Sequence, residues 1–192
     1  MSSATGMVAP GAPAATRPRV RWVLVTVGLL GALVLVALGV VALSTDDPAP
    51  RSDAPVEASV EDLRALAQRV DHPVYWAGSV PGKRFELTET RDGKVFIRYL
   101  PSGATVADRR PDFLTVATYP YRRAYAVTKA SATRPGMVSR PAPAGGIAVW
   151  RASRPASVYL AFPGTDLLME IFSPADGQSQ RLVLDGEVGP IA

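Results

Sequence analysis

Hydrophobic positions along this chain begin as one unbroken run and only later become periodic. Residues 22–43, "WVLVTVGLLGALVLVALGVVAL", contain no charged residue. As a helix rising about 1.5 Å per residue, this run would span roughly 33 Å, enough to cross a bilayer core of about 30 Å. The pattern therefore predicts one transmembrane helix. A signal peptide cleaved after Ser44 is the alternative, although its apolar core would be only about 7 to 15 residues long.

The flanks of the apolar run predict its orientation. Arg17, Arg19 and Arg21 precede it, whereas Asp46 and Asp47 follow it. Lys and Arg are concentrated on the cytoplasmic side of membrane helices. We therefore expect a single-pass protein of the cell membrane, with its N-terminus in the cytoplasm and its C-terminal part outside.

The segments on either side of the run lack hydrophobic periodicity. Residues 1–21 are mostly small residues and prolines, which is typical of a disordered cytoplasmic tail. Residues 44–57 form a polar, proline-rich linker. The remaining residues, 58–192, are numerous enough to bury an independent core, so we expect one extracytoplasmic domain there.

Helical spacing begins at Ser59. This residue is followed three positions later by Asp62, a pattern close to a capping box. The helix should end before Pro73, because the residue preceding a proline is disfavoured in the α region. Its apolar face would carry Val60, Leu63, Ala67 and Val70.

A period of two follows the helix. "RFELTET" and "KVFIRYL" flank Asp92-Gly93, a strong signal for a β-hairpin. "DFLTVATY" predicts a third strand. "PYRRAYAVTKASA" then predicts a helix with Pro120 at its first position, where proline is well tolerated.

A second run of similar order follows a Pro/Gly-rich connection, "TRPGMVSRPAPAGG". "IAVWRAS" and "SVYLAF" predict a hairpin closed through Arg154-Pro155, and "DLLMEIFS" predicts a third strand. "PADGQSQRLVL" predicts a helix with Ser173 as its N-cap.

Two interpretations of this similarity remain open: an internal βββα repeat, and chance likeness among short strands. "LTVATYP" and "LMEIFSP" occupy the same place in each run, as do "KVFIRYLP" and "SVYLAFPG". In either case we expect an α+β fold. Its mostly antiparallel sheet would have about six strands, with the helices on one face.

Composition excludes several classes of function. The chain has 192 residues and a formal charge of +4, of which the three arginines before residue 22 supply three. The exported part is thus nearly neutral and lacks the basic excess of a nucleic-acid binder. There is no cysteine and only one histidine, so a zinc or copper site would depend on carboxylates, which is uncommon. We expect no metal and no cofactor.

The single histidine, His72, stands beside an aromatic group in "DHPVYWAG". As a general base it would need a nucleophile and an orienting acceptor, and no Gly-x-Ser-x-Gly elbow is present. At a helix end it also has a structural use, because a positive charge suits the helix dipole there. The candidate ligand-binding residues are His72, Tyr75, Trp76, Tyr119 and Tyr121, although aromatic residues at a sheet are more commonly packing residues.

The stretch "ADRRPD" contains charges that nearly cancel. Arg109 or Arg110 could recognise a carboxylate. A solvated polar loop is the simpler interpretation.

The segments "HPVYWAG", "FELTETRDGKVFIRYLPSG" and "FLTVATYP" resemble a group of single-pass membrane proteins from high-GC Gram-positive (actinobacterial) bacteria. The likeness covers roughly the exported domain. That group carries no assigned activity, so the resemblance supports the membrane topology and implies nothing about mechanism.

Three hypotheses for function follow. The first is a non-enzymatic module anchored in the bilayer through residues 22–43, which binds an envelope protein or a cell-wall component. The second is a small-ligand sensor for a sugar or peptide, with a groove lined by Tyr75, Trp76 and Tyr119. The third is an envelope hydrolase that uses His72.

Overall fold

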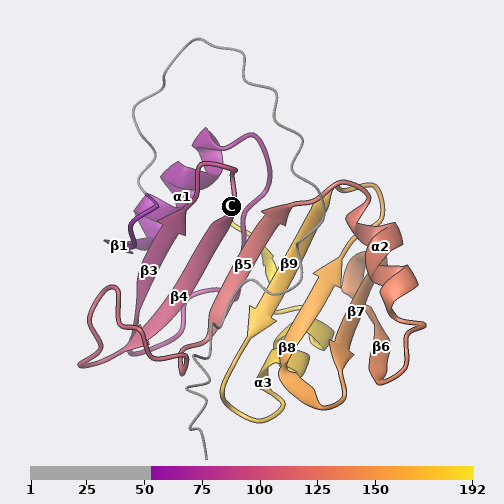
Figure 1. Cartoon of the computed structure of the whole chain (residues 1–192). Helices are drawn as coiled ribbons and strands as arrows, with labels where there is room; N and C mark the ends of the chain where they lie inside the picture. Colours follow the sequence, from indigo (N-terminus) through magenta and orange to yellow (C-terminus); the bar gives the residue numbers. More distant parts are fainter. Residues whose placement is uncertain (1–52) are drawn as a thin grey trace, which may run out of the picture. The chain divides into compact units, whose positions relative to one another are not determined.

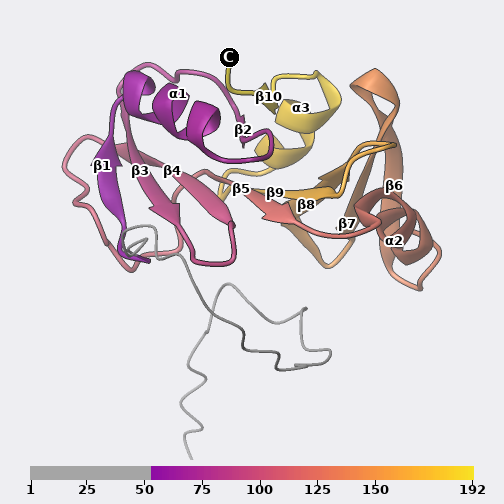
Figure 2. The same cartoon turned by 90° about the horizontal axis from the view of Figure 1, so that it is seen from above.

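The computed structural model describes residues 53–192, which form a large sheet flanked by helices (Figures 1 and 2). The transmembrane helix predicted at 22–43, the tail at 1–21 and most of the linker lie outside the described residues. Within residues 53–192, no helix is both long enough and apolar enough to span a bilayer.

An eight-stranded antiparallel sheet dominates the described part of the chain, in the order β1-β3-β4-β5-β9-β8-β7-β6. A short second ladder pairs β2 (Tyr75–Trp76) with β10 (Gly189–Pro190). The α+β class and the antiparallel sheet are thus confirmed, whereas the expectation of about six strands was too low. The strands of the large sheet are β1 (Val56–Ala58), β3 (Lys83–Glu89), β4 (Val95–Pro101), β5 (Thr115–Pro120), β6 (Met137–Ala142), β7 (Gly146–Arg151), β8 (Arg154–Ala161) and β9 (Leu167–Phe172).

Helix α1 (Val60–Arg69) begins with the predicted capping box. The Ser59 hydroxyl accepts a hydrogen bond from the Asp62 amide at 3.1 Å, and the Asp62 carboxylate accepts one from the Ser59 amide at 2.8 Å. Leu63 and Leu66 are buried. The helix ends at Arg69, before the proline, and an ion pair of 2.6 Å joins Arg69 to Glu89 at the end of β3.

Both predicted hairpins form. Strands β3 and β4 pair from Lys83 opposite Pro101 to Glu89 opposite Val95, around the turn that contains Asp92 and Gly93. Strands β7 and β8 also pair, but Arg154 and Pro155 belong to β8 and do not form the turn. The turn lies between Arg151 and Arg154, two residues before the predicted position, because β8 begins before its apolar part.

Strand β6 (Met137–Ala142) lies within the segment that the sequence predicted as a connection. It pairs with β7 along six positions and forms one edge of the sheet. Pro141 is compatible with this position, since an edge strand has one row of backbone groups that needs no partner. The proline content of the segment therefore marked a sheet edge and not the absence of a strand.

Helices α2 (Ala124–Ser131) and α3 (Gln178–Leu184) start later than predicted. Pro120 ends β5 and does not begin α2; instead Arg123 lies at the N-cap with φ 58°, and its amide donates to the Asp166 carboxylate at 2.7 Å. Ser173 accepts from the Ala175 amide at 3.1 Å and caps a turn that precedes α3. The N-cap of α3 itself is Gly177.

The helices cover both faces of the sheet, so the prediction that they share one face was wrong. Helices α1 and α3 lie on one side of the sheet and α2 lies on the other (Figure 2). The strands do follow the order expected of two similar runs. Strands β3-β4-β5 and β7-β8-β9 each form a hairpin and a third strand. The two runs meet in the middle of the sheet, where β5 pairs with β9. The helices after β5 and β9 lie on opposite faces, so the similarity between the two halves is confined to their strands.

The main core lies on the side of α1 and α3, which we call the inner face. Alternate residues of each strand point to opposite faces, so β4 sends Val95, Ile97 and Tyr99 inward and Phe96 and Arg98 outward. The opposite side is the outer face. The inner-face core includes Leu63, Leu66, Phe85, Val95, Ile97, Tyr99, Val116, Val158, Leu160, Met169, Ile171, Leu182 and Val183.

Candidate functional site

The structure places His72 between α1 and the β3–β4 turn. Its Nε2 atom lies 3.0 Å from the carbonyl oxygen of Gly93, and its Nδ1 atom lies 3.1 Å from that of Pro73. Neither contact is with a nucleophile or a carboxylate, which a general base would require. The geometry gives His72 a tethering role, in which it holds the segment after α1 to the hairpin.

Tyr75 and Trp76 form β2 on the inner face and pack against other aromatic rings. Tyr75 is stacked on Phe162 with ring centroids 5.7 Å apart, and Trp76 lies 6.0 Å from Phe85. The Tyr75 amide donates to the hydroxyl of Thr118 at 3.0 Å, which fixes β2 above β5.

Tyr119 lies on the outer face, since it follows Thr118 in β5 and adjacent strand residues point to opposite sides. The sheet therefore separates Tyr119 from Tyr75 and Trp76, so the three residues do not line one groove. Tyr121 begins the connection to α2, where its amide donates to the Asp166 carbonyl at 2.7 Å.

The outer face carries a group that was absent from the sequence prediction, which we call the outer-face cluster: Phe96, Tyr119, Tyr159 and Glu170. Its centre is Glu170 in β9. Tyr159 lies directly opposite Glu170 in β8, and Tyr119 in β5 is diagonal to it. The Tyr119 hydroxyl donates to the Glu170 carboxylate at 3.0 Å, and Tyr159 lies beside the same carboxylate across the β8–β9 pair. Phe96 meets the Tyr119 ring edge-on at 5.7 Å.

All four residues of the outer-face cluster are partly exposed. Burial, together with the negative charge of Glu170, raises the pKa of Tyr159 to about 12. The same causes, burial first, raise the pKa of Tyr119 above its ordinary value. Both phenols therefore remain neutral near neutral pH, and Tyr119 donates to the carboxylate.

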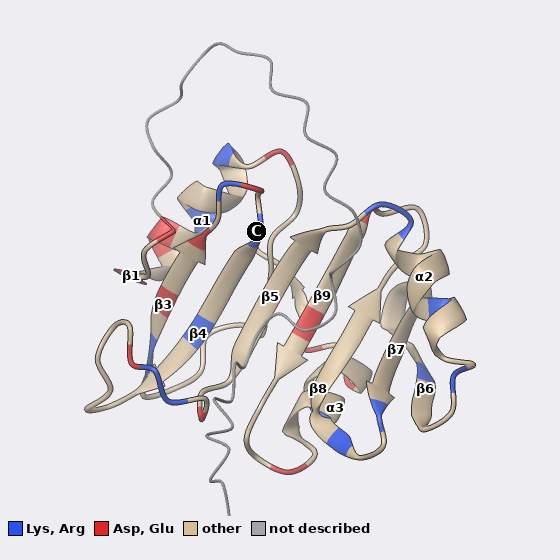
Figure 3. Cartoon of the chain, in the orientation of Figure 1, with Lys and Arg blue, Asp and Glu red and all other residues tan. Residues whose placement is uncertain are grey.

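Glu170 has few charged residues near it on the sheet. In β5, β8 and β9 the other charged residue is Arg154, at the far end of β8. Figure 3 shows the acidic band on β9 with no basic band next to it on β5 or on the middle of β8. Among the described lysines and arginines, none forms an ion pair with Glu170. Its negative charge is thus hydrogen-bonded but not neutralised.

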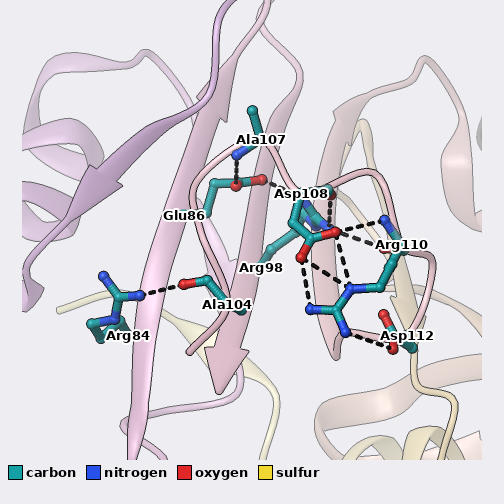
Figure 4. Close-up of polar contacts among 8 residues, drawn as sticks. All are labelled: Arg84, Glu86, Arg98, Ala104, Ala107, Asp108, Arg110 and Asp112. Carbon is teal, nitrogen blue, oxygen red and sulfur yellow. Dashed lines mark hydrogen bonds and ion pairs between the residues drawn. The ribbon is translucent and has the colours of Figure 1, made fainter. Parts of the chain in front are cut away.

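A second glutamate on the outer face, Glu86 in β3, is fully engaged within the chain. It is 2% exposed, contacts the Arg98 guanidinium at 2.5 Å and accepts from the Ala107 amide at 2.6 Å (Figure 4). Arg98 also donates to the carbonyls of Asp108 and Arg110. These contacts fasten the loop between β4 and β5 across the sheet.

The charged part of this loop, "ADRRPD", is largely satisfied by its own residues. The Arg110 guanidinium binds both oxygens of Asp108, and this hydrogen bonding lowers the pKa of Asp108 to about 2. Arg110 also lies 3.9 Å from Asp112 and over the ring of Phe113. The geometry therefore favours a structured polar loop over a carboxylate site built on Arg110.

A cavity of about 360 Å³ lies on the inner face beside Tyr75. The Tyr75 hydroxyl has no hydrogen-bond partner among the described residues. This cavity is lined by Tyr75, Ala142, Pro143, Ala144, Leu160, Phe162, Val183, Gly186, Val188 and Pro190.

Within residues 53–192, no group of three or more histidine, aspartate or glutamate side chains is arranged to hold a metal ion. The outer-face cluster differs from such a group, since it is one anion set among aromatic rings. Comparisons of the chain with models of protein families, with curated proteins and with solved structures returned no match.

Proposed function

We propose that this chain is a membrane-anchored, extracytoplasmic binding module and not an enzyme, and that the outer-face cluster is its binding surface. The anchor is the apolar run at residues 22–43, as its length and flanking charges favour. The likeness to single-pass actinobacterial membrane proteins agrees with this topology. The partner would be an envelope protein or a cell-wall component.

The observation that carries this proposal is the arrangement of Glu170 with Tyr119, Tyr159 and Phe96. Exposed tyrosines on a rigid scaffold supply contact area at a low entropic cost, and they are enriched in interfaces. All four side chains project from hydrogen-bonded strands and not from loops, so their spacing is fixed before a partner arrives. Preorganisation of this kind favours binding because little ordering remains to be done.

A photo-crosslinking experiment in the native envelope tests the proposal. A benzophenone amino acid replaces Phe96 in the full chain, and a matched control carries it at Ala65, an exposed position on α1. We expect a discrete adduct from position 96, and none from position 65, because α1 lies on the inner side of the sheet. Equal labelling from both positions, or no adduct from position 96, would contradict the proposal.

The hydrolase hypothesis requires His72 for function, whereas the binding module does not. Its ring nitrogens contact backbone carbonyls, which supports a tethering role. Substitution of His72 by alanine should therefore leave the crosslink from position 96 intact.

A small-ligand sensor remains the second candidate, on the strength of the cavity beside Tyr75. Its volume of about 360 Å³ falls within the range of ligand sites, roughly 300 to 1,000 Å³, and most of its lining is apolar. A thermal-shift screen of the full chain tests this candidate. A cavity ligand should raise the melting temperature of the wild type and have no effect on Val188→Phe, in which the new ring fills the space.

A further inference from the structure

The outer-face cluster presents a negative charge that the described part of the chain leaves without a cationic partner. Tyr119 donates a hydrogen bond to Glu170, yet no described lysine or arginine pairs with it. A carboxylate accepts up to about four hydrogen bonds, so the tyrosine donor leaves acceptor capacity unused. The charge is held in place but remains available.

The surroundings of Glu170 fit a cation better than any other group. An ammonium group carries three donors, and besides the carboxylate the phenol oxygens of Tyr119 and Tyr159 can accept hydrogen bonds from it. The aromatic faces of Phe96 and the two tyrosines attract cations through their ring quadrupoles. An anionic ligand would be repelled by Glu170 and would gain nothing from the rings.

The four residues of the cluster lie on neighbouring strands and are partly exposed. Neither the cavity beside Tyr75 nor a second one beside α1 includes any of its four residues. A bare inorganic ion on such a surface would lose most of its hydration for few contacts. The cation would therefore be presented by a larger partner, which supplies further contacts across the sheet.

We propose that the outer-face cluster recognises a lysine or arginine side chain of an extracytoplasmic polypeptide, with Glu170 as the anion and Phe96, Tyr119 and Tyr159 as the aromatic surround. This assignment rests on the proposed function and names the chemistry of its partner. In this arrangement Glu170 sets the charge preference, and the hydrogen bond from Tyr119 holds the carboxylate in place.

Titration of the full chain by amide NMR tests the assignment, with the protein in a maltoside detergent that contains no quaternary ammonium group. The probes are Nα-acetyl-lysine amide and its uncharged analogue, Nα-acetyl-norleucine amide. We expect the lysine probe to shift the amide signals of Ala117, Tyr159 and Glu170, and the norleucine probe to leave them unmoved. Equal shifts from both probes, or no shift at these positions, would overturn the assignment.

A matched pair of variants distinguishes the effect of the charge on Glu170 from the effect of removing any one negative charge from the protein. Glu170→Gln keeps the size of the side chain and one acceptor for the tyrosines, and it should weaken lysine binding roughly tenfold or more. Glu187→Gln removes an exposed acid elsewhere and should bind as the wild type does. Equal weakening by the two variants would overturn the assignment. If Glu170→Gln failed to fold, the difference between the lysine and norleucine probes on the wild type would still decide.

Three further outcomes distinguish a failure of this inference from a failure of the proposed function. A native crosslink from position 96 that survives Glu170→Gln would overturn the charge preference and leave the binding module in place. Binding of phosphatidylcholine vesicles by the cluster, competed by the lysine probe, would overturn the assignment to a polypeptide. Lysine binding without any crosslink from position 96 would count against the proposed function alone.

Discussion

Replacement of Arg98 by methionine should destabilise the domain more than any other substitution of a charged residue on the outer face. Arg98 contacts Glu86 at 2.5 Å and also donates to the carbonyls of Asp108 and Arg110. Methionine retains an apolar stem over Phe113 but removes the cation. Glu86, which is 2% exposed, would then keep a buried negative charge with one backbone donor.

The expected cost follows from the burial of this pair. Breaking a buried ion pair by removing one partner typically costs about 3 to 5 kcal/mol, because the remaining charge is left uncompensated. A whole domain is stable by only about 5 to 15 kcal/mol. With a urea slope of about 2 kcal/mol per molar, the unfolding midpoint of Arg98→Met should fall by roughly 1.5 to 2.5 M.

Urea unfolding of the full chain, followed by circular dichroism, measures this shift. Arg91→Met is the matched control, because Arg91 is exposed and its side chain has no partner among the described residues; its effect should stay within about 0.5 kcal/mol. If Arg98→Met lowered the free energy of unfolding no more than Arg91→Met, the buried ion pair would not stabilise the domain as argued.

The double variant Glu86→Leu with Arg98→Met tests whether the loss of stability comes from the charge left unpaired on Glu86. An apolar replacement of both partners often costs little, since it also removes the desolvation of two charges. We expect the double variant to recover most of the stability lost in Arg98→Met. A loss equal to the sum of the two single substitutions would refute the coupling.

Three further predictions address other parts of the structure. Substitution of His72 by alanine removes its contact with the Gly93 carbonyl and should lower the free energy of unfolding by about 1 kcal/mol in urea melts, whereas an unchanged midpoint would refute its tethering role. Because the pKa of Tyr159 rises to about 12 from an unfolded value of about 10, the stability it contributes is present below about pH 10 and is lost as the pH rises toward 12. Tyr159→Phe should therefore flatten the fall in stability over that range, and a fall as steep as in the wild type would contradict this account. In Gly146→Ala the new methyl would lie 2.8 Å from the ring of Phe162, so the variant should lose about 1 to 3 kcal/mol and change the near-ultraviolet circular dichroism; an unaltered spectrum would show that the ring moves freely.

The elements that the sequence predicted correctly depend on short-range signals. The capping box of Ser59 and Asp62 involves residues three positions apart, and the turn at Asp92-Gly93 closes a hairpin between adjacent strands. The start of α2 depends instead on Asp166, which lies 43 positions from Arg123. No local pattern contains that contact, so Pro120 was assigned to the helix although it ends β5.

The outer-face cluster could be predicted only in part for the same reason. Glu170 interrupts the apolar strand "LLMEIF" at a position where Leu167, Met169 and Ile171 point inward, so alternation alone indicates that it faces outward. Its two tyrosines come from β5 and β8, and they meet it only because β9 lies between those strands. The strand order is a property of the whole sheet, and the sequence pattern does not specify it.

Two outward-facing glutamates of the sheet, Glu86 and Glu170, show how the same residue type can be structural in one place and available for binding in another. Glu86 lies directly opposite Arg98 in the β3–β4 pair. The loop that Arg98 holds covers Glu86, which is only 2% exposed. Glu170 occupies the same face, yet its neighbours across β5 and β8 are Ala117 and Tyr159, which bring no positive charge. A charge that is neutralised and buried contributes to the fold, whereas one that is held by a tyrosine hydroxyl and left partly exposed keeps its attraction for an external cation. The difference between the two positions is the reason to expect the partner at Glu170 and not at the polar loop.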